Sequence, residues 1–577
     1  MASAFMFVFL RPTIISVTKN HRSETRKKPG DGGGRWAVGF KNTGERPVLS
    51  LQMSSDSSGW SIICQCESAS LVPLPATRSA SVFLYPTARL PPPAQPFPSF
   101  APIFKKEGKN MKKKMTFALA FCNRGFMPGE LIYGAREDMI KAVTDAGYDY
   151  IAMDADLTRF GGIETRDEGL LYAKWLKEHE GQYDGVIFSM PIFADENGAI
   201  TALQDAGVPI LMQAYPDEIG KMDFAHRRDA FCGKFSVTDV FTQYQVPFTV
   251  LKPHVVHPLS EKFQENLRDF AAICRVVNGM KRCNIGCIGA RTTAFKTVRF
   301  DEIALQKAGI NVESFDLSEL VFKVGKLADD DEKVVAKKAA LEAYSDFSGV
   351  SGEKKLTLSK IAVVIDEYIE VYHLDAIALR CWNEMEEILR VCPCVLLSEL
   401  NDRGITASCE IDMCSAVTMR AMALASETPT TVLDWNNNYG DDENKVILFH
   451  CGPVPTSLMT TKGKVTSHKM FDKNDPGSGC GTCEGRIKAG DVTISNCQTK
   501  DGKIVVYASE AKFTDDPIED EYFGCAGVCE IPDMQEKMIK LARGGFKHHT
   551  SIGAGHMKSI LKEAFTTYLG YEWVEID

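Results

Sequence analysis

The chain has 577 residues, of which 44% are apolar and 25% charged, and its formal net charge at pH 7 is −10. This length exceeds what one hydrophobic core supports and predicts roughly two to four domains. The acidic balance argues against a nucleic-acid partner, and no apolar run is long enough to span a bilayer. The 18 cysteines of so large a chain indicate reduced thiols, which predicts a cytoplasmic protein.

Residues 1–110 differ in composition from the rest of the chain. They contain RKKPGDGGGRW, SSDSSGW and RLPPPAQPFPSFAP, carry a basic excess and have no amphipathic period. This composition predicts a disordered leader. The stretch KKEGKNMKKKMTFALAF favours a true start at Met111, with a ribosome-binding sequence read through in frame before it. A transit peptide is the alternative interpretation, because the leader is basic and rich in serine.

Between residues 111 and 280, short apolar strands alternate with helices. The predicted strands are MTFALAF, YDYIAMDAD, DGVIFSMPIF and VPILMQAYP, and helical segments such as ELIYGAREDMIKAVTDAG separate them. This alternation predicts a Rossmann-like parallel sheet with helices on both faces. Ligand crevices of such sheets lie beyond the strand ends, so Asn123 and Arg124 are candidate substrate-binding residues, with Asp154 a weaker one.

A second α/β domain is predicted over residues 281–427. NIGCIGA, INVESFD and LDAIALRCW are its strands, and TAFKTVRFDEIALQKAG (293–309) is a predicted helix. Arg291 and Thr292 precede that helix, where they could meet an anionic or polyol substrate. An ordinary amphipathic helix with exposed cations is an equally good interpretation. Glu410 opens the last predicted helix, CEIDMCSAVTMRAMALAS.

Residues 428–577 are rich in predicted strands and turns, which indicates a small β-rich, barrel-like domain that a helix completes. Asp434 ends the strand TTVLD, directly before Trp435, a further candidate for substrate binding. His450 closes the strand KVILFH, and His549 lies in a predicted turn between glycines, RGGFKHHTSIGAGH.

Four cysteines of the same domain raise the possibility of a zinc site. Cys480 and Cys483 have the spacing of half a zinc site, and Cys525 and Cys529 could complete it. The second pair has a looser spacing, so incidental thiols are the better interpretation.

Glu410, Asp434, His450 and His549 together offer the carboxylates and imidazoles that suit a divalent cation. Each also has a plain structural interpretation. A glutamate near a helix start favours the helix dipole, an aspartate can form a turn, and a lone histidine is seldom a ligand.

The region from Met115 to Asp577 resembles the L-fucose/L-arabinose isomerase superfamily. In the fucose branch a glutamate is followed 24 residues later by a metal-binding aspartate, which is the spacing of Glu410 and Asp434. The ligand histidine of that branch has a second histidine seven positions on, as His549 has His556. In the arabinose branch another ligand histidine closes a strand, as His450 does in VILFHCGP.

The resemblance implies a metal-dependent aldose–ketose isomerase that acts through an enediol. Glu410 and Asp434 would be metal ligands and the proton-transfer pair, His549 the third ligand, and His450 the fourth ligand or an orienting group. Carboxylate and imidazole ligands favour Mn²⁺, with Mg²⁺, Co²⁺ and Fe²⁺ as alternatives. The adjacent His548 could replace His549 as the ligand.

The resemblance also implies a homo-oligomer, either a hexamer or a trimer. L-fucose, L-arabinose, D-arabinose and a sulfonated hexose such as sulfoquinovose all remain possible substrates. A non-catalytic sugar-binding protein with the shape of a periplasmic binding protein is the alternative function.

Overall fold

The computed structural model describes residues 114–472 and 475–577 in full. Of the segment before them it describes only the backbone of five strands, which pair antiparallel in chain order: β1 (Met6–Leu10), β2 (Thr13–Thr18), β3 (Arg35–Val38), β4 (Ser50–Asp56) and β5 (Gly59–Gln65). The chain divides into two compact units, Met1–Asn110 and Met111–Asp577. The predictions of a disordered leader and of a start at Met111 concern residues that lie mostly outside the described ones.

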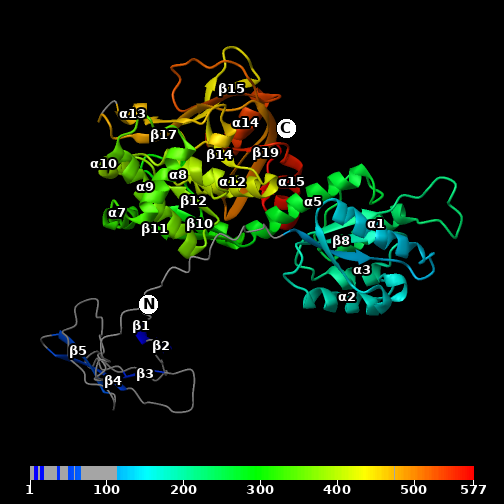
Figure 1. Ribbon diagram of the computed structural model, residues 1–577. Helices are drawn as coiled ribbons and strands as arrows, with labels where there is room; N and C mark the ends of the chain where they lie inside the picture. Colours follow the sequence, from blue (N-terminus) through cyan, green and yellow to red (C-terminus); the bar gives the residue numbers. More distant parts are fainter. Residues whose placement is uncertain are drawn as a thin grey trace. The chain divides into compact units, whose positions relative to one another are not determined.

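The first α/β domain is built on a four-stranded parallel sheet of order β7-β6-β8-β9. Figure 1 shows β8 of this sheet, with α1 on one side and α2 and α3 on the other. Its strands are β6 (Thr116–Phe121), β7 (Asp149–Ala152), β8 (Gly185–Met190) and β9 (Ile210–Ala214). Side chains of β6 alternate between two hydrophobic clusters, one shared with α1 (Leu131–Asp145) and α5 (Glu261–Met280). The other is shared with α2 (Arg166–Glu178), α3 (Glu196–Leu203) and α4 (Ala230–Gln243). The sheet is therefore covered on both faces, as predicted.

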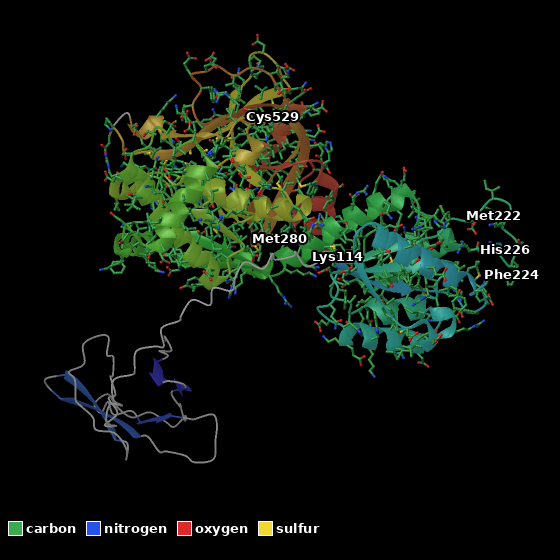
Figure 2. The ribbon with its side chains drawn as sticks, viewed as in Figure 1. Lys114, Met222, Phe224, His226, Met280 and Cys529 are labelled. Carbon is green, nitrogen blue, oxygen red and sulfur yellow. The ribbon has the colours of Figure 1, made fainter. Side chains whose placement is uncertain are left out.

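The loop between β9 and α4 exposes large apolar side chains. Ile219 is 97% exposed, Phe224 77% and Met222 55%. Figure 2 shows Met222, Phe224 and His226 on this loop, and it marks Met280 at the end of α5, where the chain passes to the second sheet.

The second α/β domain has a four-stranded parallel sheet of order β11-β10-β12-β13. Its strands are β10 (Cys283–Ile288), β11 (Ile310–Phe315), β12 (Ala376–Leu379) and β13 (Thr406–Cys409). Its helices are α6 (Glu302–Lys307), α7 (Leu317–Lys326), α8 (Glu332–Tyr344), α9 (Gly352–Tyr372), α10 (Glu384–Leu389), α11 (Cys394–Asp402) and α12 (Met413–Ser426).

The predicted helix over 293–309 is wrong in its first half. Only a short 3₁₀ turn, Lys296–Val298, forms before α6. The Asp301 side chain accepts hydrogen bonds from the backbone N–H groups of Ile303 and Ala304, and so caps a helix that begins at Glu302. Phe295 packs instead against Trp382, with ring centroids 5.6 Å apart, and this tertiary contact favours the loop conformation.

The C-terminal domain is a mixed sheet of order β16-β17-β20-β15-β14-β21-β18-β19-β22. Because β19 also pairs with β20, the six strands from β20 through β15, β14, β21 and β18 to β19 close into an antiparallel barrel. The strands are β14 (Thr430–Asn438), β15 (Lys445–His450), β16 (Lys464–Ser467), β17 (Cys480–Arg486), β18 (Gly490–Lys500), β19 (Lys503–Phe513), β20 (Cys525–Glu530), β21 (His549–Ala554) and β22 (Glu572–Trp573). Helices α13 (Lys469–Asp472), α14 (Met534–Gly544) and α15 (Lys558–Glu563) accompany them. The predicted fold class is confirmed.

Two local predictions in this region need correction. Glu410 does not open a helix: it directly follows β13, and α12 begins at Met413 because Asp412 accepts a hydrogen bond from the Ser415 backbone N–H. His549 is the first residue of β21 and does not lie in a turn. Pairing of β21 with both β14 and β18 outweighs the turn tendency of the flanking glycines.

No helix in the part of the chain that the structure describes is long and apolar enough to cross a membrane.

Candidate functional site

Strands β13, β14, β15 and β21 bring the predicted ligand residues together. Asp434 on β14 lies directly opposite His549 on β21, and Asp434 Oδ1 is 3.3 Å from His549 Nε2. Glu410 follows β13 of the second α/β sheet, and its Oε2 is 3.0 Å from the same His549 Nε2. His450 is the last residue of β15, the neighbour of β14 in the barrel. The site therefore joins the parallel sheet to the barrel.

Glu410 is held in an unusual backbone conformation. Glu410 and Ile411 have φ values of 63° and 61°, so two consecutive non-glycine residues are left-handed. Each such residue costs on the order of 1–3 kcal/mol and persists only where its surroundings enforce it. Trp382, just beyond β12, donates an indole N–H to Glu410 Oε1 at 2.8 Å. That bond fixes one carboxylate oxygen and leaves Oε2 turned toward His549.

A second layer of charge orients His549. Its Nδ1 lies 2.7 Å from Asp412 Oδ2, and the Lys547 ammonium lies 2.6 Å from Asp412 Oδ1. Both the Asp412 and His549 side chains are almost fully buried. An Nδ1–H donated to Asp412 leaves the Nε2 lone pair facing Glu410 and Asp434, which is how metal-binding histidines are commonly oriented. The sequence prediction missed Asp412 and Lys547, although each is two residues from a predicted ligand.

The pKa values follow from this crowding of charge. Burial alone would lower the pKa of His549, but hydrogen bonds and attraction from Asp412 and Glu410 outweigh it and raise that pKa to about 10. Burial likewise opposes ionisation of Asp412, yet Lys547 and His549 hold its pKa far below the usual range. The pKa of Asp434 is raised, chiefly by burial. The raised pKa of His549 therefore reflects the negative charge that Asp412 and Glu410 place beside it.

Three atoms of the site form no well-directed hydrogen bond to a described residue: Glu410 Oε2 and Asp434 Oδ1, which have only their ion-pair contacts with His549 Nε2, and His450 Nε2. Unpartnered buried polar atoms are costly, and a catalytic role or a bound ion or water is one reason for them. Three groups of potential ligand atoms lie within 4.8 Å among the described residues: Glu410–His450–His549 and Asp434–His548–His549, which share His549, and Cys381–Cys409–Glu410. The donor set fits a divalent cation.

His548 and His549, the two alternative ligands, differ in their surroundings. The His548 side chain is 42% exposed, and its Nε2 lies 3.7 Å from Asp434. His549 is buried and in closer contact with both carboxylates, which favours His549 as the ligand. His450 Nδ1 accepts a hydrogen bond from the Cys451 backbone N–H at 2.9 Å. In its neutral form His450 therefore carries a proton on Nε2, which suits a hydrogen-bond donor better than a metal ligand.

A cavity of about 220 Å³ opens beside these residues. Glu410, Asp434 and His450 supply polar groups, and aromatic and thiol side chains form much of the remaining wall. The other lining residues are Cys381, Trp382, Glu386, Cys392, Cys394, Phe449, Cys451, His468, Met470 and Phe471. A pocket with convergent polar groups on a largely apolar wall is typical of a small-molecule site.

Two models of known protein families match this chain. Residues 118–281 match the model "Fucose/sulfoquinovose isomerase, N-terminal domain", and residues 448–577 match "L-fucose isomerase, C-terminal domain". The chain belongs to the fucose isomerase-like superfamily. It is a sugar isomerase.

The curated relatives are sulfoquinovose isomerases. Those of Priestia aryabhattai and Priestia megaterium are each 23% identical over 391 residues, covering 66% of this chain and 83% of theirs. The sulfoquinovose isomerase of Alkalicoccus urumqiensis is 24% identical over 348 residues, covering 58% of this chain and 74% of its own. A periplasmic solute-binding protein of Actinobacillus succinogenes with bound D-allose is 11% identical, covers 55% of this chain and 93% of its own, and has a TM-score of only 0.15.

None of the five predicted substrate-binding residues is among the described residues that line the cavity of this isomerase. Thr292 donates its hydroxyl hydrogen to the Trp382 carbonyl, which fixes the loop carrying Phe295. Arg291 donates to carbonyls of its own loop, those of Thr292 and Thr293. Their roles in substrate binding remain predictions.

The other three candidates make contacts within their own domains. Asn123 donates to Glu164, and Arg124 pairs with Glu196 at 2.9 Å, both in the first α/β domain. Trp435 follows Asp434 on β14, so its side chain points to the opposite face of the strand, where it packs beside Tyr507.

The structure also bears on the possible zinc site. Among the described residues, no group of potential metal ligands joins Cys480, Cys483, Cys525 and Cys529. Cys525 donates its thiol hydrogen to the Cys483 carbonyl at 2.7 Å. These contacts support the interpretation of incidental buried thiols.

Proposed function

We propose that this sugar isomerase is a metal-dependent aldose–ketose isomerase that acts on a sulfonated hexose, sulfoquinovose, through an enediol. The observation that carries the mechanism is the approach of Glu410 Oε2 and Asp434 Oδ1 to the same nitrogen, His549 Nε2, at 3.0 Å and 3.3 Å. The proposed substrate rests on the curated relatives, all three of which are sulfoquinovose isomerases.

The proposed metal is Mn²⁺, held by Glu410, Asp434 and His549, with Mg²⁺, Co²⁺ or Fe²⁺ as alternatives. A bound divalent cation would act as a Lewis acid on the oxygens of C1 and C2, where negative charge develops. Asp412 would keep His549 in the tautomer that presents a lone pair from Nε2. Of its two predicted roles, fourth ligand or orienting group, His450 would take the second and donate its Nε2 hydrogen to a sugar oxygen.

The proton is carried by the two carboxylates. Glu410 has one oxygen fixed by Trp382 and the other facing the site, so it can remove the carbon-bound proton without reorientation. Asp434 is the second member of the pair. Its pKa, raised chiefly by burial, suits a group that holds a proton during part of the cycle.

We also propose that the protein is a homo-oligomer, either a hexamer or a trimer, and that it is cytoplasmic. Ile219, Met222 and Phe224 form an exposed apolar patch on the first α/β domain, and such patches commonly mark protein interfaces. In an oligomer, Asn123 and Arg124 of one copy would serve the cavity of another. Arg124 or Arg291 would then meet the sulfonate.

The test is a panel of sulfoquinovose, L-fucose, L-arabinose and D-arabinose, incubated in D₂O with Mn²⁺ and followed by NMR. We expect conversion of sulfoquinovose, with deuterium entering the carbon that receives the proton, and no conversion by Glu410→Gln. Turnover with no solvent deuterium in the product would contradict the enediol route. Turnover of a neutral aldose in preference to sulfoquinovose would overturn the proposed substrate.

A further inference from the structure

Helix α10 turns a glutamate inward at the wall of the catalytic cavity. Of the four residues that begin this helix, Met385 and Glu386 are buried, whereas Glu387 is exposed and Glu384 pairs with Arg380. Glu386 is only 3% exposed and lines the same cavity as Glu410 and Asp434. A glutamate is seldom buried to this degree unless its carboxyl group is paired.

The residues that the structure describes supply no such pairing for Glu386. Neither carboxyl oxygen has a hydrogen-bond partner among the described residues. The cavity wall around it includes the thiols of Cys381 and Cys392, which are weak donors at best. Burial raises the pKa of Glu386 to about 8, so at neutral pH the group is mostly an uncharged carboxylic acid.

An uncharged acid has a specific use in a sugar site. Its O–H donates and its carbonyl oxygen accepts, so it can pair with a sugar hydroxyl in both directions. A methionine or leucine would fill the same space without an unsatisfied polar group, and would pack at least as well. The carboxyl group is therefore costly for the empty protein and useful only when a partner enters the cavity.

We propose that Glu386 is a substrate-recognition residue whose buried carboxyl group hydrogen-bonds to a hydroxyl of the open-chain sugar held beside Glu410 and Asp434. The proposal deepens the proposed isomerase function and rests on it. Glu386 is distinct from the metal ligands and the proton-transfer pair, because it supplies binding and carries no proton between carbons.

The experiment compares Glu386→Met and Glu386→Gln with Glu387→Met as the matched control on the exposed side of α10. Measurements are kcat and KM for the accepted aldose, the melting temperature, and the dissociation constant of the corresponding alditol, which binds without reacting. For Glu386→Met we expect kcat/KM to fall about 10- to 100-fold, mainly through KM, and alditol binding to weaken in parallel. The melting temperature should stay unchanged or rise. Glu386→Gln keeps a donor and an acceptor and should stay within about fivefold of wild type.

Two results would overturn the proposal. One is a kcat/KM of Glu386→Met within about twofold of wild type, and the other is a loss of activity explained by a lower melting temperature with alditol affinity unchanged. The substrate proposal can fail separately. If wild type converts a neutral aldose and not sulfoquinovose, the same variants are compared with that aldose and its alditol.

Discussion

Replacing Asp412 by asparagine tests whether the Asp412 carboxylate orients His549 so that its Nε2 can bind a metal. The Asp412 carboxylate accepts from His549 Nδ1 at 2.7 Å and from the Lys547 ammonium at 2.6 Å. An asparagine has one acceptor oxygen, so it can serve one of these donors while its own NH₂ group faces the other. When the asparagine oxygen takes the position of Oδ1, it accepts from both Lys547 and the Ser415 backbone N–H, so the start of α12 is preserved and the NH₂ group faces His549.

Two effects of Asp412→Asn can be separated by size. Loss of an orienting carboxylate typically weakens metal affinity 10- to 100-fold, which corresponds to about 1.4–2.7 kcal/mol. Leaving the Lys547 charge buried and unpaired costs about 3–5 kcal/mol of folding stability. Adding Lys547→Met to Asp412→Asn removes that unpaired charge. We expect the double variant to recover most of the stability and to keep most of the defect in metal affinity.

The assay is the dissociation constant for Mn²⁺, measured by titration of metal-depleted protein, together with kcat at saturating Mn²⁺. Urea unfolding of the metal-depleted variants provides the stabilities independently. An Mn²⁺ affinity of Asp412→Asn within about twofold of wild type, alongside a clear loss of stability, would refute the reasoning. Asp412 would then serve only to neutralise Lys547.

Three further predictions follow from the site. Removal of divalent metal with a chelator should abolish activity, and Mn²⁺ should restore the activity better than Mg²⁺ does. If mass spectrometry verifies that the protein is metal-free and the protein is still active, the proposed Lewis acid is excluded. Glu410→Gln should lower kcat by about 10²–10⁴-fold while Mn²⁺ stays bound, and a variant retaining a tenth of wild-type kcat would exclude Glu410 as the base. In the folded protein the pKa of Glu386 is raised to about 8. As pH rises from about 4.5 to 8, Glu386 loses its proton in the unfolded chain and keeps it in the folded protein. The free energy of unfolding therefore falls over this range, by up to a few kcal/mol. Glu386→Met lacks this contribution, so its stability relative to wild type should increase between pH 5 and pH 8, and a difference independent of pH would contradict the raised pKa.

The fold class was predictable because each type of sheet leaves a local pattern. Strands β6 and β8 are buried almost throughout, so they stand out as short apolar runs between helices. The prediction of a helix over residues 293–309 was wrong in its first half. In sequence, an apolar side chain on a helix cannot be told from one that packs from a loop. Phe295 is of the second kind: it contacts the rings of Trp382, His548 and His549.

The site was predictable only in part, and through spacing carried over from related proteins. Asp412 and Glu386 were missed because nothing in CEIDMC or NEMEE marks one acid as buried and its neighbour as exposed. Asp412 becomes recognisable once β21 places His549 against it, and Glu386 once α10 faces the cavity. Burial of a charged residue depends on tertiary packing, and no local period encodes it.

The position of the ligands also has a consequence for how metal binding and folding are coupled. Glu410 belongs to the end of a parallel sheet, whereas Asp434 and His549 belong to two barrel strands. The pKa of His549 is raised because Asp412 and Glu410 favour its protonated form. A cation held by all three side chains would replace that proton and would join the sheet to the barrel. Because such a site cannot exist in the unfolded chain, its binding free energy adds to the stability of the packing between the second and third domains.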